Sequence, residues 1–220
     1  MKDLKLGFRF LKYAYGRKGM IACAVGLFVL GVPMCVVGML MATDLPGSYL
    51  LMLGACLPVQ NIISLYASDW VLASPARRRL EISAFTMMQL VVSAVIYLLV
   101  FVIGGIVVVC SSEQIENVCI QLTWTSVCAA LISIYAAASR KYFISSTIVF
   151  LIFFFILEAF VDMAWRLLPT EDGWGLFAGA ALQGMAIILC GCGLMYLLNL
   201  ALYKAPMSKL SQTAGLRRSL

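Results

Sequence analysis

Charged residues divide this chain into long uncharged stretches. Residues 19–43, 45–68, 82–112, 117–139 and 173–203 contain no Asp, Glu, Lys or Arg, and a shorter stretch, 142–157, is extended by 159–161 beyond Glu158. A helix of ~20 apolar residues crosses the hydrocarbon core of a bilayer, so each stretch can hold one span. Backbone polar groups must be paired internally in lipid, which requires these spans to be helical. The pattern predicts six transmembrane helices, over about 19–42, 47–67, 84–110, 117–139, 142–163 and 174–203.

The composition agrees with an all-α integral membrane protein. Of the 220 residues, 63% are hydrophobic and 12% are charged, whereas a soluble domain carries roughly 25% charged residues. The first uncharged stretch follows a basic segment and could be a secretory signal. It is too long for a typical signal core and no A-x-A-like cleavage site follows it, so we expect a retained span.

The basic residues indicate the orientation of the spans. With a cytoplasmic N-terminus, all but one of the sixteen Lys and Arg residues fall on the inner side, and Arg166 is the exception. The positive-inside rule therefore predicts that both termini are cytoplasmic, including a basic tail over 204–220. The net charge of +6 reflects this topology and the anionic inner leaflet rather than nucleic-acid binding.

Residues 1–18 form a separate basic and aromatic segment. At 100° per residue, Lys2, Lys5, Arg9 and Lys12 share one arc of ~80°, and leucine and aromatic side chains occupy the rest of the circumference. This pattern is typical of an amphipathic helix lying in the inner membrane interface. We expect Lys5, Phe8, Arg9 and Lys12 to contact that interface, although a cytosolic extension of the first span fits the same pattern.

The segment 68–83, "SDWVLASPARRRLEIS", separates the second and third predicted spans. Trp70 suits the headgroup level, and Ser74-Pro75 is a typical helix start with an N-cap and a proline at the first position. Glu81 follows Arg77 by four residues, close enough to pair with it. We predict a short cationic helix across the cytoplasmic face.

Two interpretations of this helix remain. Its three consecutive arginines could serve only topology and lipid headgroups. Alternatively they could dock a soluble partner, because guanidinium groups pair well with carboxylates at interfaces.

Several catalytic chemistries lack their residues in this sequence. It has no histidine, no G-x-x-x-x-G-K-[ST] motif and no G-x-S-x-G motif, which argues against His-based catalysis, a nucleotide P-loop and an α/β-hydrolase site. The eight cysteines include no C-x-x-C pair and are expected to be buried thiols, with a disulfide between Cys110 and Cys119 left open. We expect no catalytic site, metal or cofactor on this chain.

The order of these features carries a resemblance. A basic amphipathic N-terminus is followed by six spans, with an acidic residue, a tryptophan and "SPARRRLEIS" after the second. The residues that carry the likeness are Asp69, Trp70, Ser74, Pro75, Arg77, Arg78, Leu80, Glu81, Ile82 and Ser83. The chain resembles the ABC type-2 transporter permeases of Gram-positive bacteria, and among them the permease of the phenol-soluble modulin peptide exporter. It departs from that pattern where "AFT" replaces a lysine-tyrosine after Ser83.

The resemblance implies a specific assembly in the bacterial cytoplasmic membrane. Segment 68–83 would be a coupling helix seated on a separate ABC ATPase subunit, which binds ATP and Mg²⁺. A second contact would come from Arg140, Lys141 and Tyr142. Two permeases, identical or paralogous, would pair with two ATPases to export an amphipathic peptide or a lipid-like substrate. The coupling residues would be Trp70, Ser74, Pro75, Ala76, Arg77, Arg78, Arg79 and Glu81.

Two other functions fit the same topology. One is the six-span substrate-binding component of an energy-coupling importer, which would bind a small vitamin as a monomer. The other is a non-transporting membrane scaffold or immunity protein, whose activity would not depend on an ATPase. The direction of transport follows only from the resemblance.

Overall fold

The described part of the protein is helical. The computed structural model describes residues 2–11, 17–41, 47–60, 77–139, 141–142, 144–153, 156 and 173–204, and no strand occurs among them. The elements are α1 (Lys2–Leu11), α2 (Arg17–Met41), α3 (Gly47–Gln60), η1 (Arg79–Ala84, a π-helix), α6 (Phe85–Cys110), η2 (Ser112–Gln114), α7 (Ile115–Ser139) and α9 (Trp174–Leu202). A further apolar helix covers Ile144–Phe153.

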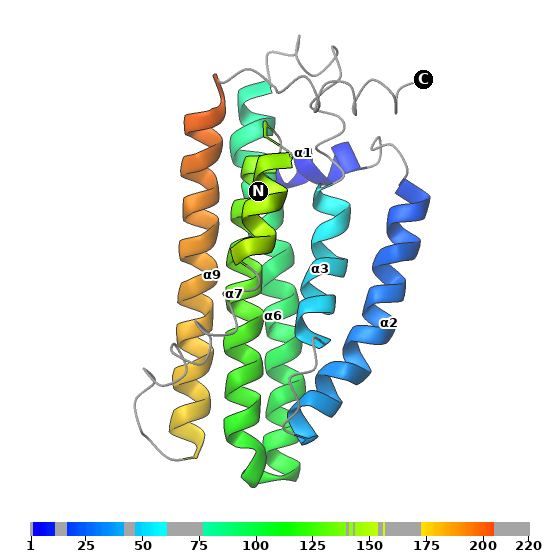
Figure 1. Ribbon diagram of the computed structural model, residues 1–220, viewed down its shortest axis with the longest axis vertical. Coiled ribbons are helices and arrows are strands. Elements are labelled where there is room, and N and C mark those ends of the chain that lie inside the picture. The colour runs from blue at the N-terminus through cyan, green and yellow to red at the C-terminus, as the bar shows by residue number, and fades with distance from the viewer. Residues whose placement is uncertain are drawn as a thin grey trace.

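The long helices form a bundle, and α1 lies crosswise at one end of it (Figure 1). Helices α2 and α6 run away from the α1 end, whereas α3, α7 and α9 run toward it. Consequently α7 ends at the α1 end and α9 begins at the opposite end.

Within the described residues, four helices are long and apolar enough to cross a membrane. They cover Lys18–Met41, Arg79–Cys110, Ser112–Ser139 and Trp174–Leu202, and they coincide with the first, third, fourth and sixth spans expected from the sequence. The protein thus has the character of a multi-pass membrane protein. The shorter helices Gly47–Leu57 and Ile144–Phe153 lie within the second and fifth expected spans. Of these two spans, residues 61–67 and all of 154–163 except residue 156 fall outside the described residues.

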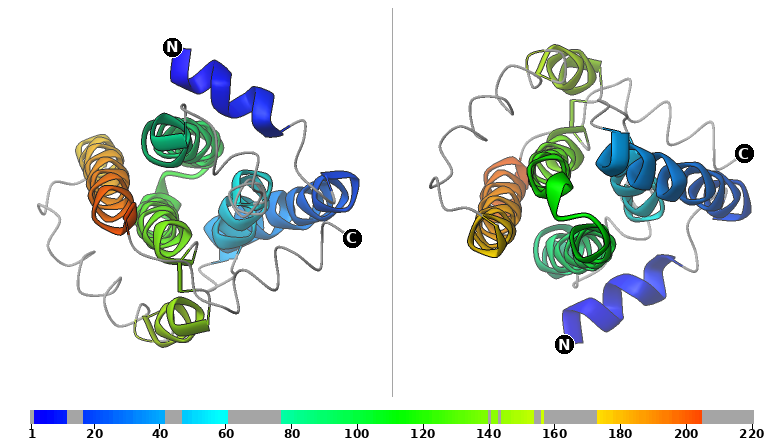
Figure 2. Two further views of the ribbon diagram at one scale, coloured as in Figure 1. Left: turned by 90° about the horizontal axis from the view of Figure 1, so that it is seen from above. Right: turned by 90° about the horizontal axis from the view of Figure 1, so that it is seen from below.

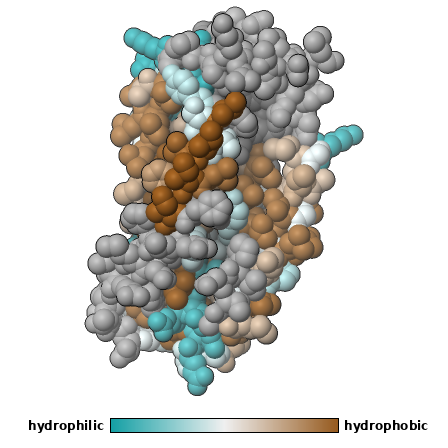
Figure 3. Space-filling view, in the orientation of Figure 1, coloured by the Kyte–Doolittle hydropathy of each residue, from teal (hydrophilic) through white to brown (hydrophobic). Residues whose placement is uncertain are grey.

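The outer surface of the bundle is apolar. In Figure 3, brown side chains cover much of the coloured surface, and the strongest teal patches lie toward its two ends. Large exposed apolar residues include Leu30 on α2, Val109 on α6 and Leu182 on α9. A soluble monomer rarely exposes contiguous apolar patches of this extent, so the surface is suited to lipid.

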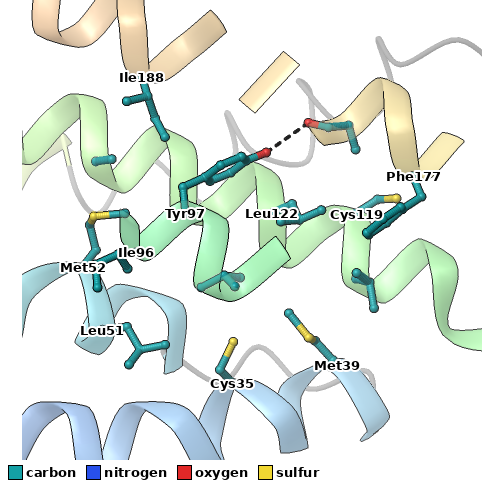
Figure 4. Close-up of a cluster of buried hydrophobic side chains, with 14 of the residues drawn as sticks. Cys35, Met39, Leu51, Met52, Ile96, Tyr97, Cys119, Leu122, Phe177 and Ile188 are labelled. Atoms are coloured by element: carbon teal, nitrogen blue, oxygen red, sulfur yellow. Dashed lines mark hydrogen bonds between the residues drawn. The ribbon is translucent and has the colours of Figure 1, made fainter. Parts of the chain in front are cut away.

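The interior is closely packed between α3, α6, α7 and α9. Leu51, Tyr97, Leu122 and Ile188 come from these four helices and point toward one another (Figure 4). The Tyr97 hydroxyl lies 3.4 Å from the Ala180 carbonyl and 3.1 Å from that of Ala181, so it can donate a hydrogen bond to α9. This polar contact fixes α6 against α9 within an apolar core.

The start of α6 differs from the arrangement expected from the sequence. A separate helix over 68–83 was expected before a span over 84–110. In the structure, residues 77–84 continue directly into α6, with helical backbone angles at Arg78, Ala84 and Phe85. Within this helix the hydrogen-bonding pattern changes only in the π-helical turn η1, which directly follows Arg78. Arg77, Arg78 and Arg79 are therefore part of one continuous helix with α6. Residues 68–76 lie outside the described residues.

Candidate functional site

The described Lys and Arg residues gather at the α1 end of the bundle. They occur in α1, at the beginning of α2, before α6, directly after α7 and at the end of α9 (Figure 1). The acidic residues Glu113, in η2, and Glu116, in the first turn of α7, lie at the opposite end. The α1 end also holds residues 77–81, which we call the arginine segment. Its three guanidinium groups have different surroundings.

Arg77 is partly buried and makes contacts within the protein. Its Nε–H donates to Glu81 Oε1 at 2.7 Å, and its guanidinium lies 5.5 Å from the centroid of the Tyr203 ring at the end of α9. Glu81 is only 4% exposed, and a buried carboxylate is costly unless a charge or hydrogen bond compensates it. Arg77 therefore stabilises the helix start and connects it to α9.

Arg79 connects the arginine segment to α1. One of its terminal N–H groups donates to Asp3 Oδ1 at 2.6 Å, and its own side chain stays 63% exposed. Beside this pair, Leu4 and Leu6 pack against a buried cluster that includes Leu80. Arg79 thus contributes to the docking of α1 while remaining within reach of solvent or a partner.

Arg78 differs from both neighbours. It is exposed, and no ion pair joins it to another of the described residues. The hypothesis that Arg77, Arg78 and Arg79 together hold a partner is therefore refined by the geometry. Of the three, Arg78 has the guanidinium that is most available for a carboxylate on another molecule.

The other residues expected to make contacts fall into two groups. Lys5, Phe8 and Arg9 are exposed on α1, as their proposed contact with the membrane interface requires. Near the end of α7, Lys141 is buried, with 5% exposure, whereas Tyr142 is 44% exposed. The remaining expected residues, Lys12, Trp70, Ser74, Pro75, Ala76 and Arg140, lie outside the described residues.

Buried hydrogen bonds join α9 to α6 close to the arginine segment. The Asn199 side-chain amide of α9 donates to Thr86 Oγ1 at 3.2 Å, and the Thr86 hydroxyl donates to the Ile82 carbonyl at 2.7 Å. Thr86 lies just after the π-helical turn, where the usual backbone pattern is interrupted. Together with Arg77 and Tyr203, these bonds attach the first turns of α6 to the last turns of α9.

Among the described residues, the polar side chains buried between the long helices carry amide and hydroxyl groups. Ser48 Oγ–H donates to Gln121 Oε1 at 3.0 Å, joining α3 to α7, and Gln89 Nε2 lies 3.0 Å from Cys56 Sγ, joining α6 to α3. Such bonds commonly hold membrane helices together. We therefore interpret these amides as packing contacts between helices.

The described residues provide no evident centre for metal binding or thiol chemistry. They include no group of three or more His, Cys, Asp or Glu side chains that could hold a metal ion. Cys110 and Cys119, the pair considered for a disulfide, are both free thiols, the first exposed and the second buried.

Three residues with clear roles here were missed by the sequence analysis. Asp3 and Tyr203 are partners of arginines far away along the chain, so no local spacing indicated them. Gly7 lies where α1 approaches α6 most closely, because an added Cβ would overlap Met88 Sδ. A glycine inside an otherwise amphipathic helix was the one available signal of that contact.

No family model, curated protein or solved structure matches this chain. Function is therefore inferred from the arginine segment, the helices that hold it and the topology.

Proposed function

We propose that this chain is the transmembrane permease subunit of an ATP-driven ABC exporter, which pairs with a separate ATPase subunit. The observation that carries the proposal is the exposed guanidinium of Arg78, presented at the cationic end of a membrane-type bundle by neighbours that are fixed in internal contacts. Arginine in such a setting suits bidentate pairing with a carboxylate of a protein partner.

The arrangement of helices supports six spans. Helices α3, α7 and α9 all run toward the α1 end (Figure 1). Helix α7 ends at the α1 end, whereas α9 begins at the opposite end. A further crossing between α7 and α9 completes six passes, with the beginning of α2 and the end of α9 on one side. That side carries the described cations, so the positive-inside rule places it in the cytoplasm, where an ATPase would bind.

The continuity of the helix supports a coupling role. Residues Arg79–Cys110 form a single helical stretch of 32 residues, so a force applied at Arg78 acts on the end of a rigid element that extends through the bundle. In the proposed cycle, ATP and Mg²⁺ are bound by the ATPase, and its closure moves this helix. A second permease, identical or paralogous, forms the other half of the pathway.

The substrate class follows from the sparse charge of the interior. In the described parts of α2, α3, α6, α7 and α9, the buried polar side chains carry hydroxyl, amide or thiol groups, which cannot neutralise an ionic solute as charged side chains would. An amphipathic peptide or a lipid-like molecule suits such an interior. Export, rather than import, comes from the resemblance of segment 68–83 to exporter permeases.

The proposal is tested by purifying the detergent-solubilised chain from its own cells and identifying what accompanies it. We expect a P-loop ATPase to co-purify with the wild type and to be lost from Arg78→Ala. Lys204→Ala is the matched control, because it removes another exposed cation at the same end and should retain the ATPase. Arg78→Lys should retain only part of it, since an ammonium group cannot reproduce the planar two-point contact.

The result has two informative alternatives. Absence of an ATPase from the wild type would contradict the proposal and leave the arginines with a topological role. Equal recovery with Arg78→Ala and the wild type would move the docking contact away from this guanidinium. Equal membrane levels of all variants are needed, measured by blotting of the membrane fraction.

A further inference from the structure

Helix α1 has two faces with different surroundings. Gly7 is buried and Asp3 is paired with Arg79, so one face is docked on the bundle. The opposite face presents Lys5, Phe8 and Arg9, all exposed. At 100° per residue these three lie within one third of the helix circumference. We call them the outer face of α1.

The position of α1 matches that of a membrane surface. It lies crosswise to the long helices (Figure 1) and, viewed along the bundle, outside the ring that they form (Figure 2). A helix perpendicular to the spans runs parallel to the bilayer plane, and at the perimeter it meets lipid rather than protein. Its outer face therefore points to where headgroups would be.

The chemistry of the outer face fits anionic lipid. Phe8, 46% exposed, provides an apolar side chain for the acyl boundary, and the cations of Lys5 and Arg9 flank it. Interfacial helices of this type bind through buried apolar area together with attraction to anionic headgroups. Each Lys or Arg near such a surface strengthens binding by about fivefold.

The docked face joins α1 to η1 and the first turn of α6 at three points. Arg79 bonds Asp3 at 2.6 Å, Leu4 and Leu6 pack on the buried cluster around Leu80, and Gly7 approaches Met88 so closely that an added Cβ would overlap Met88 Sδ unless the methionine side chain moved. The first two of these contacts involve η1, where the π-helical geometry interrupts the regular α-helical bonds. A change in how α1 is held therefore acts directly on the turn that carries Arg79 and follows Arg78.

We infer that α1 is a lipid-responsive clamp, in which anionic headgroups bound at Lys5, Phe8 and Arg9 hold α1 against η1 and thereby fix the arginine segment. The inference rests on the proposed function only for the use made of Arg78, because the clamp itself requires no ATPase. It adds a regulatory input to that site. The segment is ordered for docking when the surrounding leaflet is anionic.

The test measures backbone hydrogen exchange of the full chain in nanodiscs of phosphatidylcholine alone and of phosphatidylcholine mixed with phosphatidylglycerol. In the mixture we expect exchange to slow by about fivefold or more in α1 and also in residues 79–84, since two cations contribute. In the Lys5→Gln/Arg9→Gln variant the lipid effect should disappear from both segments. Lys18→Gln removes an exposed cation at the start of α2 and serves as the matched control, with the lipid effect retained.

A second pair of variants separates lipid binding from the clamp. Gly7→Leu should undock α1, so phosphatidylglycerol would still protect α1 but would no longer protect residues 79–84. Asp3→Asn removes only the exposed ion pair and should weaken the same transmission without disturbing the buried contacts. Protection of α1 alone in the wild type, or no lipid effect at all, would overturn the inference, as would an unchanged effect on residues 79–84 in Gly7→Leu. None of these readouts depends on the ATPase, so failure of the clamp and failure of the proposed function are distinguishable.

Discussion

Arg77 and Glu81 form the contact on which the shape of the arginine segment depends most directly. Arg77→Ala would leave the Glu81 carboxylate, which is 4% exposed, without the guanidinium 2.7 Å away. A hydrogen bond to a charged group contributes about 2 kcal/mol, so we expect a loss of stability of that order. The measurement is the unfolding transition in detergent, monitored by loss of helical circular dichroism.

The double variant provides the control for this prediction. Arg77→Ala/Glu81→Gln removes the buried carboxylate charge together with the guanidinium, and most of the lost stability should return, because a neutral amide is cheaper to bury than a carboxylate. If the double variant were as unstable as Arg77→Ala, the guanidinium would stabilise the protein mainly through Tyr203 instead.

Residue contacts were predictable where the spacing along the chain was short. The pairing of Arg77 with Glu81, four residues apart, was expected from helical geometry and is confirmed. The pairing of Arg79 with Asp3 joins residues 76 positions apart, and it depends on how α1 docks. No local pattern contains that information, so the different roles of the three arginines emerged only from the structure.

At the scale of elements, two glycines of α9 are expected to respond oppositely to the same substitution. A Cβ on Gly184 would overlap the hydroxyl and ring carbons of Tyr97, whereas a Cβ on Gly179 meets nothing within 4 Å. An aromatic ring cannot fold away as a flexible side chain can, so Gly184→Ala should push α9 from α6 and cost about 1–3 kcal/mol. Gly179→Ala, the matched control, should change stability by less than about 0.5 kcal/mol.

The readout for this pair is thermal unfolding in the same detergent, together with hydrogen exchange at the last turns of α9. Separation of α9 from α6 should increase exchange there in Gly184→Ala, because the Thr86–Asn199 bond joins the same two helices. Equal stability of both variants would mean that Tyr97 adjusts without moving the helix.

Helix locations were predictable to the extent that lipid alone determines them. The uncharged stretches anticipated α2, α6, α7 and α9 within a few residues, because length and hydropathy are sufficient to specify a span. The boundary at 83–84 was different. Ser74-Pro75 indicated a helix start, but the continuation of residues 77–84 into α6 arises from packing against α1 and α9, which the local sequence does not encode.

At the scale of the whole molecule, charge separation and helix direction lead to the same orientation. The described Lys and Arg residues gather at the α1 end, and Glu113 and Glu116 lie at the other (Figure 1). The sequence predicted this separation from positions along the chain alone. The fold adds that the beginning of α2 and the end of α9 lie at the same end, as an even number of crossings requires.

The orientation is testable with two cysteines placed at exposed positions at opposite ends of the bundle, Glu113→Cys and Lys204→Cys. A membrane-impermeant maleimide added to intact cells should label Glu113→Cys well above the wild-type background and leave Lys204→Cys at that background. After permeabilisation, both should be labelled. The wild type is the necessary control because Cys110, close to Glu113, is itself exposed.

The reverse pattern in intact cells would place the arginine segment outside the cytoplasm, where it could not meet an ATPase, and would contradict the proposed function. Labelling of both sites before permeabilisation would mean that the two ends face the same side, which is incompatible with helices that cross the membrane between them.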